Sequence, residues 1–82
     1  MYFVYALKSI KKNYIYVGMT KDLDKRLKEH QDGKGKATRP YRPFKMIYSE
    51  AFPYRFEARK REKFLKTGVG KEFLKKNFLH SF

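Results

Sequence analysis

The sequence predicts an α+β domain in which a small three-stranded antiparallel sheet is flanked by helices, in the order β-β-α-β-α-α. Short runs rich in aromatic and β-branched residues at 2–7, 14–17 and 45–52 indicate the strands. Apolar residues at helical spacing indicate helices at about 22–30, 55–66 and 71–78. Because the chain has 82 residues and no internal repeat or long linker, we expect one domain over residues 1–82.

The first two runs predict a β-hairpin that carries two tyrosines on one face. If residues 9–12 form the loop, Tyr5 lies opposite Tyr16, and Phe3 lies opposite Gly18. Paired tyrosines in a hairpin are commonly packing contacts. The alternative interpretation is a floor for a polar ligand, with two hydroxyl groups and with Gly18 leaving room for close backbone approach.

The first helix carries a polar pair on the edge of its apolar face. Thr20 or Asp22 is suited to cap its start, and it is expected to run to about His30. Arg26 and His30 are four residues apart at the border of the core face, so both lean toward the sheet. Taken singly, Arg26 is best explained as a surface arginine whose aliphatic stem is buried. His30 is best explained as a histidine at the C-terminal end of a helix, where the helix macrodipole favours it.

Residues 31–44 form one long loop, because two glycines and two prolines interrupt regular structure. Basic and aromatic side chains alternate along it, which suits contact with phosphates and stacking on bases or sugars. The alternative is a solvated loop with an aromatic ring in the core, which we expect for Phe44 but not for the arginines. The candidate nucleic-acid-binding residues are Lys34, Lys36, Arg39, Tyr41 and Arg42.

The second helix, at 55–66, carries a carboxylate on its buried side. Glu62 lies on the apolar stripe, where a charge is costly unless it is paired or binds a cation. Two interpretations remain open for this residue. It is either the partner of Arg61 or Arg26 in a buried ion pair, or a metal ligand.

Net charge is the strongest compositional signal, since 21 Lys and Arg against 8 Asp and Glu give +13. A polyanionic partner explains this excess best, with nucleic acid first, and the alternative is a basic protein without a defined partner. No helix combines a continuous basic face with a broad lipid-facing stripe, so we expect no membrane association. Without cysteine, a membrane-spanning run or a signal peptide, the chain is expected to be cytoplasmic.

Several short motifs, in order and over nearly the whole chain, resemble those of the GIY-YIG nucleases. The two tyrosine motifs appear as Phe3-Val4-Tyr5 and Tyr16-Val17-Gly18, with ten residues between the tyrosines. Arg26 and His30 match an R-x-x-x-H helix, and the stretch from Ala58 to Glu62 matches an A-x-x-x-E helix. Phe3 and Val17 replace a glycine and an isoleucine of the family motifs. Asn77 is a weak match to a late asparagine.

This resemblance implies a metal-dependent endonuclease that hydrolyses DNA phosphodiester bonds, structure-specific or non-specific, with repair or recombination as its setting. Glu62 would hold one Mg²⁺ or Mn²⁺ ion, and Arg26 would stabilise charge at the phosphorus. Tyr16 or Tyr5 would position or deprotonate the attacking water, and His30 would relay a proton or hold Tyr5. The sequence leaves this division of roles open, and it does not indicate the oligomeric state.

A second function class remains open beside the enzyme. The chain would then be a non-catalytic basic DNA- or RNA-binding module with a degenerate nuclease site. The phenylalanine at position 3 supports this alternative, because it fills space beside Tyr5 that the family's glycine leaves open. An RNA nuclease or RNA-binding factor is a further alternative, which competition between the two nucleic acids would test.

Overall fold

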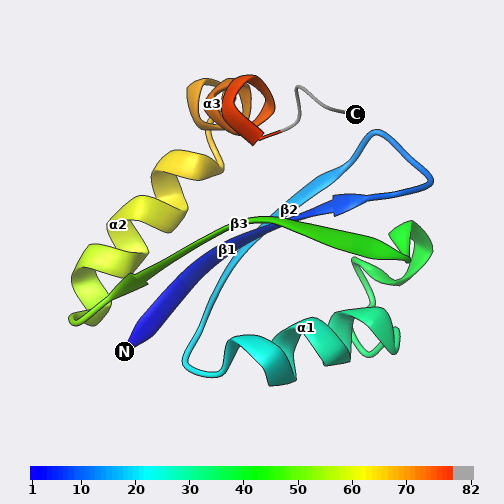
Figure 1. Ribbon diagram of the computed structural model, residues 1–82, viewed down its shortest axis with the longest axis horizontal. Coiled ribbons are helices and arrows are strands. Elements are labelled where there is room, and N and C mark those ends of the chain that lie inside the picture. The colour runs from blue at the N-terminus through cyan, green and yellow to red at the C-terminus, as the bar shows by residue number, and fades with distance from the viewer. Residues whose placement is uncertain (79–82) are drawn as a thin grey trace.

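A computed structural model describes residues 1–78 and confirms the predicted fold class (Figure 1). The three strands form one antiparallel sheet in the order β2-β1-β3, so that the first strand is central. The elements, in chain order, are β1 (Tyr2–Ser9), β2 (Ile15–Thr20), α1 (Leu23–Gln31), the short 3-10 turn η1 (Arg39–Tyr41), β3 (Phe44–Phe52), α2 (Arg55–Leu65) and α3 (Gly68–Phe78).

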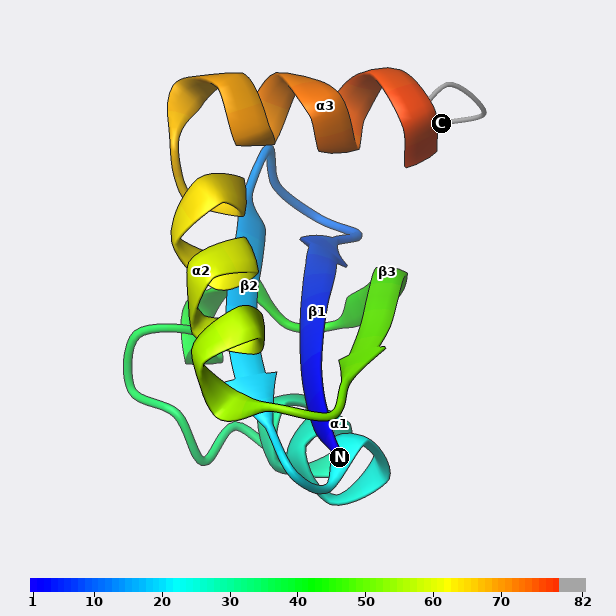
Figure 2. The ribbon, with the colours of Figure 1, turned by 90° about the vertical axis from the view of Figure 1, so that its left-hand side faces the viewer.

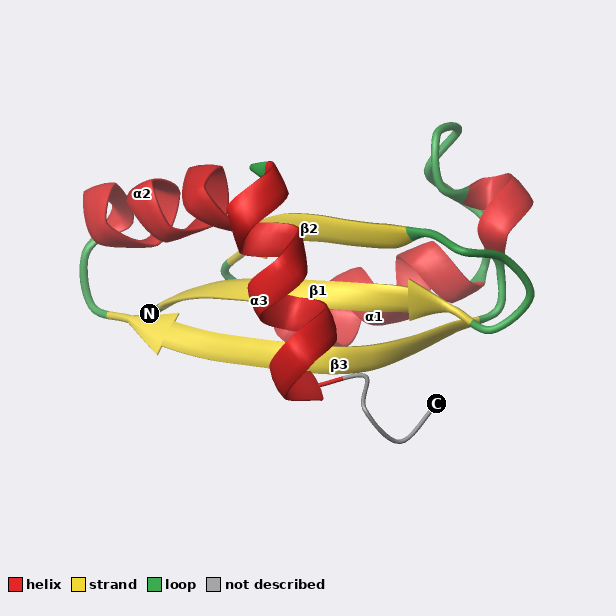
Figure 3. Cartoon of the chain, turned by 90° about the horizontal axis from the view of Figure 1, so that it is seen from above, coloured by secondary structure: helices red, strands yellow, loops and turns green. Residues whose placement is uncertain are grey.

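Helices cover both faces of the sheet, and each face has its own apolar cluster. Figure 3 shows α3 crossing one face, with α1 behind the other, and Figure 2 shows α2 alongside β2. The cluster under α2 and α3 contains Val4, Ala6, Ile15, Val17, Ala58, Leu65 and Leu74. The cluster on the α1 face has Tyr5, Leu7 and Phe44 at its centre. The period-two alternation along β1 therefore separates two layers.

The hairpin register differs from the prediction by two residues. Tyr5 pairs with Gly18 and Leu7 pairs with Tyr16, whereas Tyr5 was expected opposite Tyr16. The loop begins one residue later than expected, because Ser9 belongs to β1 and its Oγ accepts a hydrogen bond from the Lys12 amide at 3.0 Å. A shift of two residues returns every side chain to its original face. Both tyrosines therefore remain on the α1 face.

The helix boundaries follow their caps. Asp22 is the N-cap of α1, and its side chain accepts a hydrogen bond from the Lys25 amide at 3.1 Å. The third helix begins at Gly68, three residues earlier than expected, because Thr67 Oγ1 accepts a hydrogen bond from the Gly70 amide. The long loop contains one 3-10 turn, which includes Pro40 in its first turn. Among residues 1–78, none of the helices is both long enough and apolar enough to span a bilayer.

Candidate active site

The two phenols lie together on the α1 face, over a glycine. The ring centroids of Tyr5 and Tyr16 are 6.1 Å apart, and Tyr5 is 1% exposed. A Cβ atom at Gly18 would lie 2.6 Å from the Tyr5 hydroxyl and 2.9 Å from the Tyr16 ring, closer than real Cβ contacts. Gly18 is therefore required because the Tyr5 side chain lies across its backbone.

His30 joins the end of α1 to these phenols. Its Nε2 atom lies 3.0 Å from the Tyr5 hydroxyl, and its Nδ1 atom lies 3.1 Å from Thr38 Oγ1. The imidazole is 2% exposed, and its ring centroid is 4.8 Å from that of Tyr16. Since the Thr38 hydroxyl also donates to the Gly35 carbonyl, at 3.4 Å, we assign the imidazole proton to Nδ1. Tyr5 then donates to Nε2.

Arg26 brings a positive charge to the same cluster. Its Nη1 atom forms an ion pair with Glu29 Oε1 at 3.1 Å, and its charge acts on the pKa values of Tyr5 and His30. Burial, followed by the neighbouring Tyr16, raises the pKa of Tyr5 to about 12, although Arg26 acts in the opposite direction. Burial and the charge of Arg26 lower the pKa of His30.

At neutral pH this cluster therefore contains a neutral phenol, a neutral imidazole and one guanidinium. The side chain of Arg26 is 42% exposed, so the cation is within reach of solvent and of a ligand. A cation held by an ion pair near the partly buried Tyr16 hydroxyl suits an oxyanion that gains negative charge during a reaction. The structure thus brings together Tyr5, Tyr16, Arg26 and His30.

Glu62 lies in a different layer. Its side chain is 8% exposed and belongs to α2, which packs on the face opposite the phenols. The partners of its carboxylate are Lys66, at 3.1 Å, and Arg59, at 3.4 Å. The suggested pairing with Arg61 or Arg26 is therefore wrong. These two arginines pair with Glu50 and Glu29, which lie closer to them.

Metal binding at Glu62 would rest on a single carboxylate. Among the residues described, no group of three or more His, Cys, Asp or Glu side chains is placed to hold an ion. Mg²⁺ needs only one or two protein carboxylates when waters and substrate phosphate complete its shell. The cations at Glu62 are themselves about half exposed, with side-chain exposures of 57% and 53%, so they can move aside. The donor chemistry therefore fits one hard divalent ion.

The other predicted residues lie outside the phenol cluster. Lys34, Lys36 and Arg39 belong to the loop before β3, as does Arg42, which lies against the backbone of Gly33. The Tyr41 ring stacks on Tyr14 with centroids 3.8 Å apart, so one of its faces is occupied by protein. Phe44 is in the core, as expected. Asn77 donates to the Phe73 carbonyl within α3, on the sheet face opposite α1.

Two residues of the cluster were not identified from the sequence. Thr38 is 2% exposed and bonds to His30, but it comes from a loop with no periodicity to indicate its burial. Glu29 holds Arg26 across one helical turn. That spacing, i to i+3, is visible in the sequence and was sufficient to find the pair.

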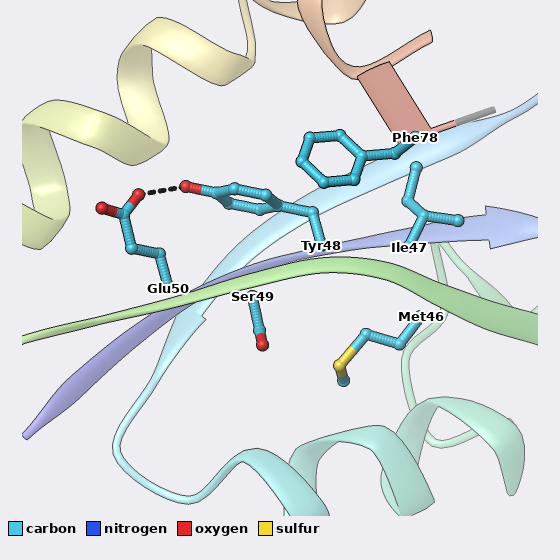
Figure 4. Close-up of a pocket in the computed structure, with 6 residues that line it drawn as sticks. All are labelled: Met46, Ile47, Tyr48, Ser49, Glu50 and Phe78. Atoms are coloured by element: carbon cyan, nitrogen blue, oxygen red, sulfur yellow. Dashed lines mark hydrogen bonds between the residues drawn. The ribbon is translucent and has the colours of Figure 1, made fainter. Parts of the chain in front are cut away.

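A separate surface pocket of about 520 Å³ lies along β3 (Figure 4). Tyr48 donates a hydrogen bond to Glu50 there, and Phe78 packs beside the Tyr48 ring. None of the predicted site residues lines this pocket, whose members are Met46, Ile47, Tyr48, Ser49, Glu50 and Phe78. It is therefore distinct from the phenol cluster.

The chain is similar in sequence and in fold to known proteins. A family model described as the GIY-YIG catalytic domain matches residues 1–77. The UPF0213 protein YazA of Bacillus subtilis is 44% identical over 66 residues, covering 79% of this chain and 66% of that protein. A UPF0213 protein of Staphylococcus saprophyticus is 39% identical, covering 80% of each. The solution NMR structure of a UPF0213 protein from Bacillus halodurans is 38% identical, with a TM-score of 0.55, over 90% of this chain and 82% of that one. On its sequence and its fold, this chain belongs to the GIY-YIG family.

Proposed function

We propose that this protein is a metal-dependent endonuclease that hydrolyses DNA phosphodiester bonds, structure-specific or non-specific, in DNA repair or recombination. The observation that carries the proposal is the cluster in which His30 holds Tyr5 at 3.0 Å, with Tyr16 beside it and the charge of Arg26 acting on it. Membership of a nuclease family and the net charge of +13 support a nucleic-acid substrate.

The two phenols have different roles in this proposal. Tyr5 keeps its proton at neutral pH, because its pKa is raised to about 12, and it donates to His30. Tyr16 is only partly buried, so it is better placed to orient the attacking water. Arg26 stabilises the negative charge that develops on the phosphorus oxygens as the bond from water forms and the bond to the leaving strand breaks.

Glu62 would hold a single Mg²⁺ or Mn²⁺ ion, which would offset negative charge on the leaving oxygen when bound. The protein supplies one carboxylate to this ion, and that carboxylate forms ion pairs with Lys66 and Arg59 at the edge of the core. A substrate phosphate that contacts both Arg26 and Glu62 has to reach past the β2 edge of the sheet, where α2 lies alongside (Figure 2).

A cleavage assay tests the proposal. Supercoiled plasmid and branched DNA are incubated with Mg²⁺ or Mn²⁺ and with the wild type, Glu62→Ala or Arg26→Ala. We expect both variants to lose cleavage, and Glu72→Ala to retain it, because Glu72 is 78% exposed on α3. Equal cutting by Glu62→Ala and the wild type would remove the role of the carboxylate.

One observation favours the second candidate function, a non-catalytic basic DNA- or RNA-binding module. Glu62 already has two cationic partners and lies in the layer opposite the phenols. Such a module would bind nucleic acid with steep salt dependence and would not cleave it with any divalent metal. Competition between DNA and RNA of matched length would show which nucleic acid it prefers.

A further inference from the structure

A pocket of about 400 Å³ lies between the β1–β2 loop and the loop before β3. It is lined by basic, amide and proline side chains from three segments of the chain, namely Lys11, Gln31, Arg39, Pro40, Arg42 and Pro43. The cluster of Tyr5, Tyr16, Arg26 and His30 does not line it. Lys11 and Gln31 were not among the residues that the sequence suggested for binding.

Hydrogen bonds between these segments hold the walls of the pocket in place. The Gln31 side chain accepts from the Phe44 amide at 2.9 Å and donates to the Phe44 carbonyl at 2.8 Å. The Ile10 amide donates to the Pro43 carbonyl at 2.9 Å. The end of α1, the start of β3 and the β1–β2 loop are thereby held together around the pocket.

Both arginines of the pocket are positioned by backbone carbonyls. Arg39 Nε donates to the Gly33 carbonyl at 2.8 Å, and Arg42 Nε donates to the Arg39 carbonyl at 3.1 Å. Gly33 has a φ of +79°, and a Cβ atom there would lie 2.5 Å from Arg42 Nη1. The bare backbone of Gly33 therefore lets the Arg42 guanidinium pack directly against it.

No ion pair within residues 1–78 neutralises the positive charge of the pocket. No ion pair found among residues 1–78 includes Lys11, Arg39 or Arg42. Within the same residues, the hydrogen bonds that position the two arginines use their Nε atoms, which leaves the Nη atoms available to a ligand. Two guanidinium groups that line one pocket, each held at Nε by a backbone carbonyl, are the kind of donors that recognise phosphate.

We propose that this pocket is a preorganised phosphate-binding site. It holds a phosphate group of the bound nucleic acid that is not the phosphate being cleaved. The assignment of the phosphate to nucleic acid rests on the proposed function. The pocket is connected to the phenol cluster through the chain, because Gln31 follows His30 and Arg39 follows Thr38. A phosphate bound there would fix the position of the strand relative to Arg26.

Inorganic phosphate is the first probe, because it tests the pocket without DNA or cleavage. Sodium phosphate replaces sodium chloride at constant ionic strength while amide and arginine Nε signals are followed by ¹H–¹⁵N NMR. We expect saturable shifts at Gly33, Arg39 and Arg42. The variant R39Q/R42Q should bind at least about tenfold more weakly. A matched variant, K63Q/K76Q, also removes two exposed positive charges, from α2 and α3, and should bind phosphate as the wild type does.

The conservative variant R39K/R42K separates geometry from charge. Lysine keeps the charge but lacks the planar guanidinium group of arginine. That group can donate from Nε to a backbone carbonyl while its Nη atoms bind an anion. We expect its phosphate affinity to fall between those of the wild type and R39Q/R42Q. Wild-type affinity in R39K/R42K would overturn the preorganised site, and equal weakening in K63Q/K76Q would show general charge attraction instead. The NMR spectra also report whether each variant is folded.

Short oligonucleotides then identify the source of the phosphate. Binding of a 5′-phosphorylated strand and of the same strand with a 5′-hydroxyl is measured by fluorescence anisotropy over a salt series. Tighter binding of the phosphorylated strand assigns a terminal phosphate, and equal binding assigns a backbone phosphate. In either case R39Q/R42Q should make the negative slope of log K against log salt shallower, by about 0.7 for each phosphate that the variant no longer neutralises. An unchanged slope would overturn the site for nucleic acid even if the protein cleaves DNA, whereas a changed slope without cleavage would leave the site standing and remove the nuclease.

Discussion

Replacing Gly18 with alanine is expected to displace the Tyr5 phenol from His30. The added Cβ would lie 2.6 Å from the Tyr5 hydroxyl oxygen and 2.7 Å from its Cζ atom. Tyr5 is 1% exposed and packed on the α1 face, so its ring has little free space into which it can move. Because the φ of Gly18 is not positive, alanine adds no backbone strain there, and the whole effect comes from the side-chain contact.

The size of the effect follows from two contributions. Overpacking of a filled core costs about 1–3 kcal/mol. If the phenol leaves His30, the Tyr5–His30 hydrogen bond at 3.0 Å is broken as well, which costs about 0.5–1.5 kcal/mol. We therefore expect Gly18→Ala to lower the free energy of unfolding by about 1.5–4.5 kcal/mol and to abolish cleavage even where the protein remains folded.

Urea denaturation followed by circular dichroism measures the change, with Gly68→Ala as the matched control. A Cβ at Gly68 would meet no atom within 4 Å, so that variant should be as stable as the wild type or slightly more stable. Adding Tyr5→Phe to Gly18→Ala removes the hydroxyl that the new methyl group strikes, and should recover part of the stability. Wild-type stability and activity in Gly18→Ala would refute the close approach of Tyr5 to the β2 backbone.

Three further predictions concern other parts of the molecule. His30→Gln should flatten the pH dependence of stability between pH 5 and 7. Because burial lowers the pKa of His30, the unfolded state binds a proton more tightly than the folded state, so wild-type stability falls below about pH 6.5. Denaturation at each pH measures this difference. Glu62→Gln should cost at most about 1 kcal/mol in thermal unfolding, since its cationic partners are about half exposed, yet should lose Mn²⁺-dependent cleavage, with Glu72→Gln as the control. Gly70→Ala should destabilise the protein by about 1–3 kcal/mol, unlike Gly68→Ala, because its Cβ would lie 2.1 Å from the Phe64 carbonyl oxygen, and backbone cannot move aside as a side chain can.

Periodicity in the sequence predicted which faces would be buried, but not how the strands would pair. Tyr5 and Tyr16 reach the same face because alternation along each strand survives a register shift of two residues. The register itself depends on Ser9, which belongs to β1 and whose hydroxyl accepts a backbone amide within the loop. No Asn-Gly turn in the sequence specified that loop.

The ion-pair partners of Glu62 were not predicted, although its position on the helix was. Glu62 was correctly expected on the buried side of its helix. Its partners Lys66 and Arg59 stand four residues after it and three residues before it, and they are the two cations at helical spacing from Glu62. Helical spacing was therefore sufficient to indicate them, whereas Arg61 and Arg26 were expected. Thr38 was missed for a different reason, because its burial depends on a loop path that no sequence pattern specifies.

The position of the two layers constrains how any substrate can be bound. Arg26 and the phenols lie on the α1 side of the sheet, whereas Glu62 belongs to the α2 side. Tyr16 and Gly18 lie on β2, which is an edge strand, and α2 lies alongside it (Figure 2). A phosphate group that meets both sets of residues would therefore lie across this edge. In that geometry the substrate itself would complete the site, because it would supply the oxygen ligands that a lone carboxylate lacks, and its negative charge would draw Lys66 and Arg59 away from Glu62.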